Sequence, residues 1–177
     1  MVAVLAAPVR AQWENVETQM VLGAGVSYAR PSPEARAGAG LAGHAGLRHQ
    51  RGNVMFSLRA GVHYGGRASY SDSAVWDRFN EVAVMVGYPL TRSQNSLVVL
   101  STGVASVSGD RVEPSPEISG GKTNVPFRRR LGIPLQVALS LPGPRSGIGF
   151  TAHVNMNPEE VFGAVTLNYL IGSSSGS

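Results

Sequence analysis

Eight segments of the chain alternate apolar residues with small or polar ones, and this period of two constrains the fold more than any other feature. The clearest segment is NVMFSLRAGVHY, in which Val54, Phe56 and Leu58 fall on one face and Arg59 and His63 on the other. Side chains alternate between two faces in this way along a β-strand. The segments cover residues 20–28, 37–48, 53–64, 81–88, 96–107, 131–140, 147–156 and 161–171.

The length and composition of these segments indicate strands that cross a membrane. They have 8–12 residues, close to the roughly 9–11 residues that a tilted strand needs to span a bilayer. Charged residues make up only 15% of the chain, against roughly 25% in an ordinary soluble domain. After residue 12, no run approaches the roughly 20 apolar residues of a membrane-spanning helix. The predicted fold is therefore all-β: an eight-stranded antiparallel up-and-down transmembrane β-barrel.

The ionisable residues indicate which face of the strands meets lipid. All of those within the eight segments lie opposite the apolar row: His44, Arg48, Arg59, His63, Glu81 and His153. The rest of that face is mostly small or polar and contains no lysine, which suits a narrow, enclosed interior. An Arg or Lys facing lipid at the midplane would cost roughly 2–4 kcal/mol. We therefore expect the apolar row to face lipid and the polar row to line the lumen.

The first six connections alternate in length, whereas the seventh, NPEE, is short and breaks the trend. Those after the second, fourth and sixth segments are short (HQRGN, PLTRSQN and PGPRS), and those after the first, third and fifth are longer (ARPSPEAR, GGRASYSDSAVWDRFN and GDRVEPSPEISGGKTNVPFRRR). Bacterial outer-membrane barrels have short periplasmic turns and long external loops. Tyr28 and Tyr64 near the long-loop end, with Tyr88 and Tyr169 near the other, resemble the two aromatic girdles of such barrels.

Pro134 conflicts with this pattern, because it lies inside the sixth segment. Proline cannot donate a backbone hydrogen bond, and a closed barrel offers no free edge to accommodate it. Either a bulge or a distortion on the lumen side would reconcile the proline with a strand. The alternative is that this strand begins later.

The N-terminal residues 1–11, MVAVLAAPVRA, resemble the end of a secretory signal peptide, with a short apolar stretch and a small-residue cleavage site. The alternative is an ordinary N-terminal strand. We assign residues 1–11 to this signal-peptide remnant, 12–172 to the barrel and 173–177 to a flexible tail. The absence of cysteine excludes disulfides and thiolate metal sites. Basic residues are scattered and carry no nucleic-acid motif, so no nucleic-acid partner is expected.

Taken together, these features resemble the small eight-stranded outer-membrane barrels, the OmpA-like and opacity-type proteins. The resemblance covers residues 19–172 and rests on the eight repeats, the alternating connections and the final segment VFGAVTLNYLIG. It implies a location in the bacterial outer membrane and a structural or surface-interaction role. One departure is that Tyr169-Leu170-Ile171 is followed by GSSSGS, where family members usually finish on an aromatic residue.

We predict that the lumen holds a structural polar network, with no cofactor and no metal. Arg59 and Glu81 face inward from adjacent segments and are expected to pair, because a charge in a closed lumen needs a partner. An eight-stranded barrel is just wide enough to be filled by its side chains, so no open pore is expected. The predicted network comprises His44, Arg48, Arg59, His63, Glu81, Gln136, His153, Asn155 and Asn168.

At the outer mouth, Arg128, Arg129 and Arg130 could bind the phosphates of lipopolysaccharide or simply form a solvated loop end. Trp76, Phe79 and Phe127 fall in the long connections, where they could contact a protein or another surface ligand.

Three other functions stay open: a lipid-A-modifying enzyme, a narrow channel and a soluble lipid-binding barrel. A deacylase would need a His-x-Ser pair and an acid on the lipid-facing surface near the rim. The nearest candidate is HVN, in which His153 and Asn155 lack the serine and are expected to face inward. No enzymatic activity is therefore predicted, and the sequence leaves the oligomeric state open.

Overall fold

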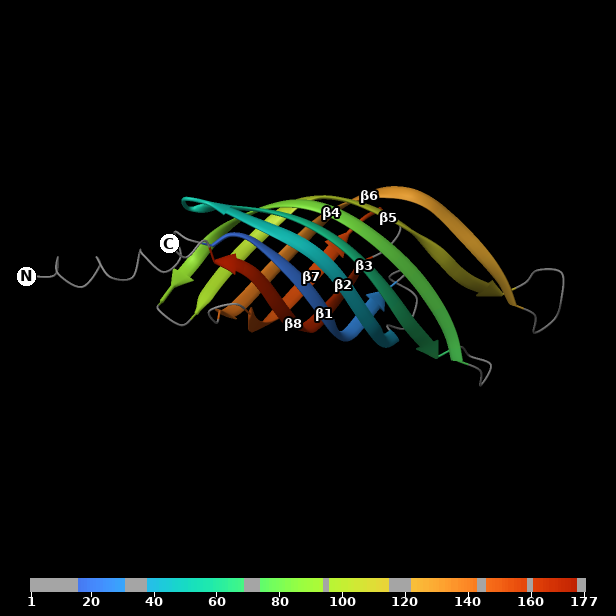
Figure 1. Cartoon of the computed structure of the whole chain (residues 1–177). Coiled ribbons are helices and arrows are strands. Elements are labelled where there is room, and N and C mark those ends of the chain that lie inside the picture. Colours follow the sequence, from blue (N-terminus) through green and yellow to red (C-terminus); the bar gives the residue numbers. More distant parts are fainter. Residues whose placement is uncertain are drawn as a thin grey trace, which may run out of the picture.

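The computed structural model is a closed barrel of eight antiparallel strands in chain order, with β8 pairing back to β1 (Figure 1). It describes residues 16–30, 38–68, 74–93, 96–114, 122–142, 146–158 and 161–174. This confirms the predicted fold class. The described residues contain no helix that is long and apolar enough to cross a membrane. The strands are β1 (Val16–Arg30), β2 (Gly38–Arg51), β3 (Val54–Ala68), β4 (Ala74–Arg92), β5 (Leu97–Pro114), β6 (Lys122–Pro142), β7 (Ser146–Met156) and β8 (Val161–Ser174).

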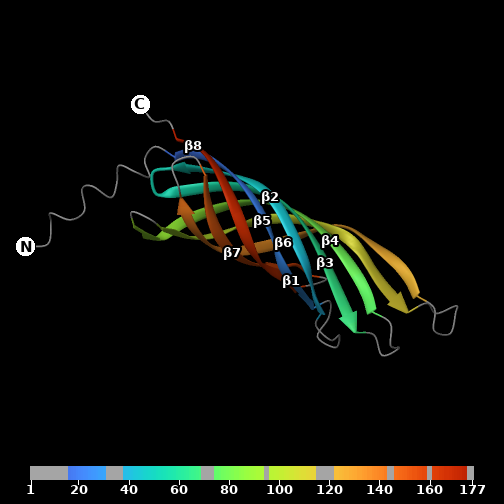
Figure 2. The ribbon, with the colours of Figure 1, turned by 60° about the horizontal axis from the view of Figure 1, so that its bottom comes forward.

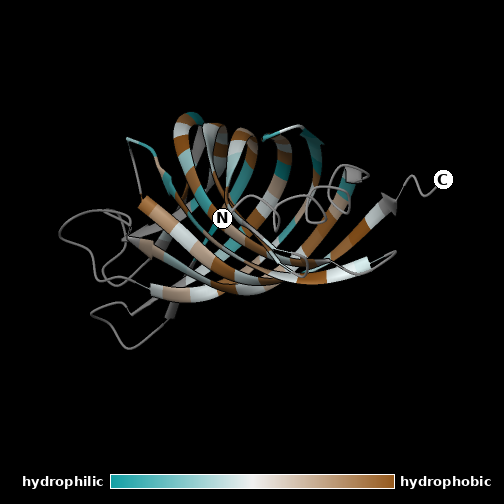
Figure 3. Cartoon of the chain, turned by 90° about the vertical axis from the view of Figure 1, so that its left-hand side faces the viewer, coloured by the Kyte–Doolittle hydropathy of each residue, from teal (hydrophilic) through white to brown (hydrophobic). Residues whose placement is uncertain are grey.

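The side chains alternate between an exposed apolar wall and a buried lumen, as the period of two predicts. On β4, Val84 is 62% exposed, whereas the next residue, Met85, is 1% exposed. Figure 3 shows this alternation as bands of opposite hydropathy along the strands. The four girdle tyrosines, Tyr28, Tyr64, Tyr88 and Tyr169, are also exposed. The faces are therefore as expected, with apolar side chains outside.

In the fifth segment, residues 96–107, the sequence has apolar residues on both alternating rows, and the structure shows which row faces outward. Leu97, Val99 and Val107 face inward and are buried, while Leu100 and Val104 face outward and are exposed. The sequence pattern is ambiguous here because part of the lumen is itself apolar.

The barrel has two different ends, which we call the turn end and the loop end. At the turn end, β2 and β3 are joined through Gly52, whose φ of +59° suits a residue without a Cβ. Val16 of β1 pairs with Ser174 of β8 at the same end. The predicted signal remnant lies outside the described residues, as does the tail from residue 175 onward.

The strands continue much further toward the loop end than the sequence predicts. Residues 65–80 and 109–130 were expected as loops, but β4 begins at Ala74, β5 continues to Pro114 and β6 begins at Lys122. Figure 2 shows β3 to β6 extending beyond the rest of the barrel at this end. The ladder between β5 and β6 runs to the pair Pro114–Lys122. Polar residues can form such a ribbon because the paired strand satisfies their backbone groups without an apolar face.

Pro134 lies within β6, so the alternative that this strand begins later is wrong. The register with β5 is the same on both sides of it, from the pair Thr102–Leu135 to the pair Ala105–Gly132. The bulge lies nearer the loop end, between Val107 and Gly109. Pro134 is thus accommodated by a local interruption of the ladder, and its carbonyl accepts a 3.0 Å hydrogen bond from Thr102 Oγ1.

Candidate functional site in the barrel lumen

All nine side chains predicted to line the lumen lie on its inner face. Eight are buried and His44 is half-buried; the eight are Arg48, Arg59, His63, Glu81, Gln136, His153, Asn155 and Asn168. They come from six different strands, so the barrel closure brings them together.

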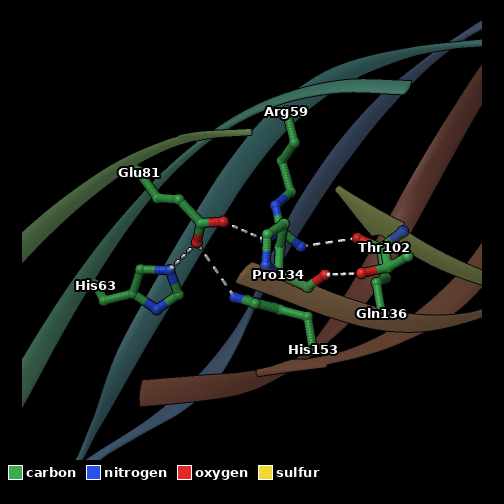
Figure 4. A network of polar contacts seen from close by, with 7 residues as sticks. All are labelled: Arg59, His63, Glu81, Thr102, Pro134, Gln136 and His153. Carbon is green, nitrogen blue, oxygen red and sulfur yellow. Dashed lines mark hydrogen bonds and ion pairs between the residues drawn. The ribbon is translucent and has the colours of Figure 1, made fainter. Parts of the chain in front are cut away.

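Arg59 is at the centre of one group of polar contacts (Figure 4). Its Nη2 donates to Glu81 Oε1 at 2.6 Å, and its Nη1 donates to Gln136 Oε1 at 2.7 Å. Glu81 was expected near the outer end of its strand, but β4 begins seven residues earlier, at Ala74, which places Glu81 well inside the barrel. The two charges therefore meet at the same depth, on adjacent strands β3 and β4.

Two histidines approach the other oxygen of the same carboxylate. His63 Nε2 lies 3.8 Å and His153 Nε2 3.7 Å from Glu81 Oε2. The two imidazole rings meet edge to face, with centroids 5.2 Å apart. Figure 4 shows both rings directed toward the carboxylate from opposite sides of the lumen. Glu81 therefore holds an arginine on one oxygen and faces two imidazoles with the other.

A second group surrounds Arg48. Its Nη1 donates to Ser140 Oγ at 3.2 Å and its Nη2 to Thr151 Oγ1 at 3.5 Å. Thr151 Oγ1 also accepts a 2.7 Å hydrogen bond from Asn168 Nδ2, and Asn168 Oδ1 accepts one from Thr166. A cavity of about 10 Å³ is lined by residues of both groups, among them Arg48 and Arg59. This volume is close to the minimum that holds one water molecule.

Apolar side chains cover this polar region toward both ends of the lumen. Phe79 and Phe162 stack with ring centroids 5.6 Å apart on the loop-end side. Met55, Leu97 and Val99 form a buried cluster on the turn-end side. The polar groups of the lumen are thus enclosed between two apolar layers.

Phe79 corrects a prediction. It was expected in a loop as a residue for partner contact, but it lies in β4 and is fully buried in the lumen. The sequence signal was misread because the polar residues around it suggested a loop. The side chains of Trp76 and Phe127 lie outside the described part of the chain.

The arginine run also lies in a strand rather than in a loop. Residues 128–130 belong to β6, and Arg129 and Arg130 are exposed; the side chain of Arg128 is outside the described part. Among the described residues, β6 pairs with β7 from Ile133 onward, so the residues of β6 before Ile133 form an open strand edge. Charged residues and proline commonly protect such an edge from pairing with another chain, and the exposed Pro126 lies there as well.

Several functional side chains were missed. Thr151 and Ser140 are hydrogen-bond partners of Arg48, and their position on the inward row was the available signal. Asp77 is buried at 1% exposure because β4 extends through a segment expected as loop.

The HVN segment does not present a reactive group to lipid. His153 and Asn155 are 4% and 0% exposed and face the lumen. Within the described part of the chain, neither amide atom of Asn155 has a hydrogen-bond partner. The geometry thus gives no lipid-facing histidine at this position.

No family model and no curated protein matches the sequence. The structure nevertheless has the fold of the small eight-stranded outer-membrane barrels. It is similar to neisserial surface protein A (NspA), with a TM-score of 0.69 and 9% identity over 88% of this chain and 97% of that one. For Ail of Yersinia pestis the TM-score is 0.60 at 10% identity, over 90% of this chain and 99% of Ail. For OprG of Pseudomonas aeruginosa it is 0.58 at 7% identity, over 90% and 98%.

Proposed function

We propose that this protein is an integral barrel of the bacterial outer membrane with a structural or surface-interaction role and with its loop end outside the cell. The observation that carries the proposal is the exposed apolar wall. Large apolar side chains on every strand are exposed, while Arg48, Arg59 and Glu81 are enclosed. An exposed apolar surface of this extent is unfavourable in water and favourable in lipid.

The filled lumen supports a structural role over conduction. Arg59, Glu81 and Gln136 are joined directly across it, and the stacked pair Phe79–Phe162 lies on the loop side of them. A conducting path would have to break an ion pair and displace aromatic rings. Enzymatic modification of lipid A is less well supported, because His153 faces inward.

The surface role would reside at the loop end. Arg129 and Arg130 are exposed on β6, and Arg78 of β4 lies 5.7 Å over the ring of the girdle residue Tyr64. Guanidinium groups bind phosphate bidentately, so these side chains could contact the phosphates of lipopolysaccharide. The same arginines also protect the open edge of β6, and the two roles are compatible.

Two measurements test the membrane proposal. The folded protein should require detergent or lipid to stay in solution and should migrate differently in gels before and after boiling. A folded protein that stays soluble without detergent would contradict it.

The orientation can be tested with single cysteines, since the chain has none of its own. Thr123→Cys is exposed on β6 at the loop end, and Asn53→Cys is exposed at the β2–β3 turn. A membrane-impermeant maleimide should label Thr123→Cys on intact cells but Asn53→Cys only after permeabilisation. The reverse result would place the loop end in the periplasm.

A further inference from the structure

We propose that His63, Glu81 and His153 form a binding site for a divalent transition-metal ion of the Zn²⁺ class, which goes beyond the proposed surface role. One ligand atom from each residue lies within 4.8 Å of the others, and all three residues are buried. They come from β3, β4 and β7, so the closed barrel assembles ligands that are distant in sequence.

Two of the three separations between the ligand atoms are close to those around a small metal ion. Zn²⁺ binds imidazole nitrogen and carboxylate oxygen at about 2.0–2.2 Å, which separates tetrahedral ligands by about 3.3–3.5 Å. Here Glu81 Oε2 lies 3.8 Å from His63 Nε2 and 3.7 Å from His153 Nε2. Both distances exceed a good hydrogen bond. A shift of a few tenths of an ångström would bring Glu81 Oε2 to ligand spacing from each histidine. The two imidazole nitrogens lie within 4.8 Å of each other and would have to approach by up to about 1.5 Å.

Two of the three ligand atoms also lack a hydrogen bond. Among the described residues, Glu81 Oε2 and His153 Nε2 are buried without a hydrogen-bond partner. Buried polar atoms are rarely left in this state, and an ion is one explanation when they converge. Because Glu81 Oε2 faces two imidazoles at once, a single ion could satisfy both atoms.

Arg59 acts as a positioning residue for the site. Its 2.6 Å hydrogen bond engages Glu81 Oε1 and leaves Oε2 directed at the histidines (Figure 4). Groups that fix a metal ligand from behind are a regular part of metal sites. The arginine charge also opposes a cation, so we expect reversible binding rather than a permanently held ion.

The chemistry of the ligands selects the class of metal. Two imidazoles and one carboxylate suit Zn²⁺, Co²⁺ or Ni²⁺, whereas Mg²⁺ and Ca²⁺ prefer oxygen ligands. Three protein ligands leave a position for water. Phe162 packs 4.8 Å from the His63 ring and shields the site on the loop side.

The test uses the folded full-length barrel in detergent, freed of metal with a chelator and titrated with Co²⁺ as an optical probe. We expect one equivalent to give a visible absorption band that Zn²⁺ displaces. His63→Gln and His153→Gln should each weaken Co²⁺ binding at least tenfold. The matched control His49→Gln, on the exposed surface, should bind Co²⁺ like wild type.

Absence of stoichiometric Co²⁺ binding by folded wild type would overturn the proposal, as would loss of the band in His49→Gln. Heat-shifted gel mobility establishes whether each variant is folded. If a ligand variant does not fold, X-ray absorption of the Zn²⁺-loaded wild type decides instead: two imidazoles and one carboxylate support the site, and any other ligand set refutes it. None of these outcomes bears on detergent dependence, so the metal proposal can fail while the membrane proposal stands.

Discussion

The outer wall and the lumen of this barrel are made by the same strands but depend on different interactions. On β4, Val82, Val84 and Val86 face outward and need only an apolar environment. Directly before them, Glu81 faces inward, where it depends on a specific ion-pair partner, Arg59. The wall is therefore tolerant of which apolar residue it carries, whereas the lumen is specific. Substitutions on the two faces should therefore differ in how much unfolding free energy they cost and in which second substitution restores it.

The largest effect should come from breaking the lumen ion pair. Arg59→Met leaves Glu81 buried without its cation, and we expect a loss of about 3–5 kcal/mol in unfolding free energy. Urea unfolding in lipid vesicles measures it. The double variant Arg59→Met/Glu81→Gln should recover part of the loss, because no uncompensated charge remains. Unchanged stability and unchanged heat-modifiability in Arg59→Met would show that the pair is not structural.

A charge on the wall should cost slightly less. Val84 lies near the middle of β4 and is 62% exposed, so Val84→Arg should cost about 2–4 kcal/mol in the same vesicles. Leu90, also exposed but close to the turn end, provides the matched control, and Leu90→Arg should cost about 0–1 kcal/mol. Equal costs at the two positions would mean that the wall does not cross a bilayer as described.

Glycines extend the comparison to the backbone. A Cβ at Gly103, in the lumen, would meet the backbone carbonyl of Val84, which has little room to move. Gly103→Ala should therefore destabilise by about 1–3 kcal/mol, as overpacking does. At Gly43 the nearest atoms to a new Cβ are 3.8 Å away, so Gly43→Ala should be close to neutral. Similar unfolding curves for the two variants would contradict this difference.

The smallest effect on stability is expected at the loop end. Arg129→Ser/Arg130→Ser removes two exposed charges and should change stability by no more than about 0.5 kcal/mol. It should nevertheless reduce binding to lipopolysaccharide-containing vesicles, with little change for vesicles of neutral phospholipid. Equal binding by the variant and wild type would leave edge protection as the role of these arginines.

The sequence predicted the faces well because lipid imposes a strict rule on one of them. No charged residue lies in the alternating row that contains Val54, Phe56 and Leu58, and this was enough to assign that row of β3 to the outer wall. The fifth segment was ambiguous, since Leu97 and Val99 pack against lumen residues instead of lipid. An apolar residue facing an apolar lumen leaves no signal in the alternation.

The ends of the strands and the detailed contacts of the lumen could not be predicted. Phe79 and Asp77 precede the predicted segment 81–88, and the strand there is held by pairing with its neighbours. No apolar row faces lipid at these residues, so the sequence shows no alternation that would predict a strand. The Arg59–Glu81 pair could be predicted from the sequence because the two strands are adjacent. The approach of His153 to Glu81 was not, because it crosses the lumen from β7 and depends on how the barrel closes.

The extension of β5 and β6 beyond their neighbours determines how far the tip of this hairpin projects from the barrel. Residues 122–132 of β6 precede its first pair with β7, at Ile133, and Lys122 still pairs with Pro114 of β5. At about 3.3 Å per residue, these residues extend for roughly 35 Å along the strand. A hydrogen-bonded ribbon holds its tip at a set distance, unlike a coil of the same length. In the proposed orientation, shortening both strands by equal numbers of residues would lower that tip in steps through the carbohydrate layer of an outer membrane.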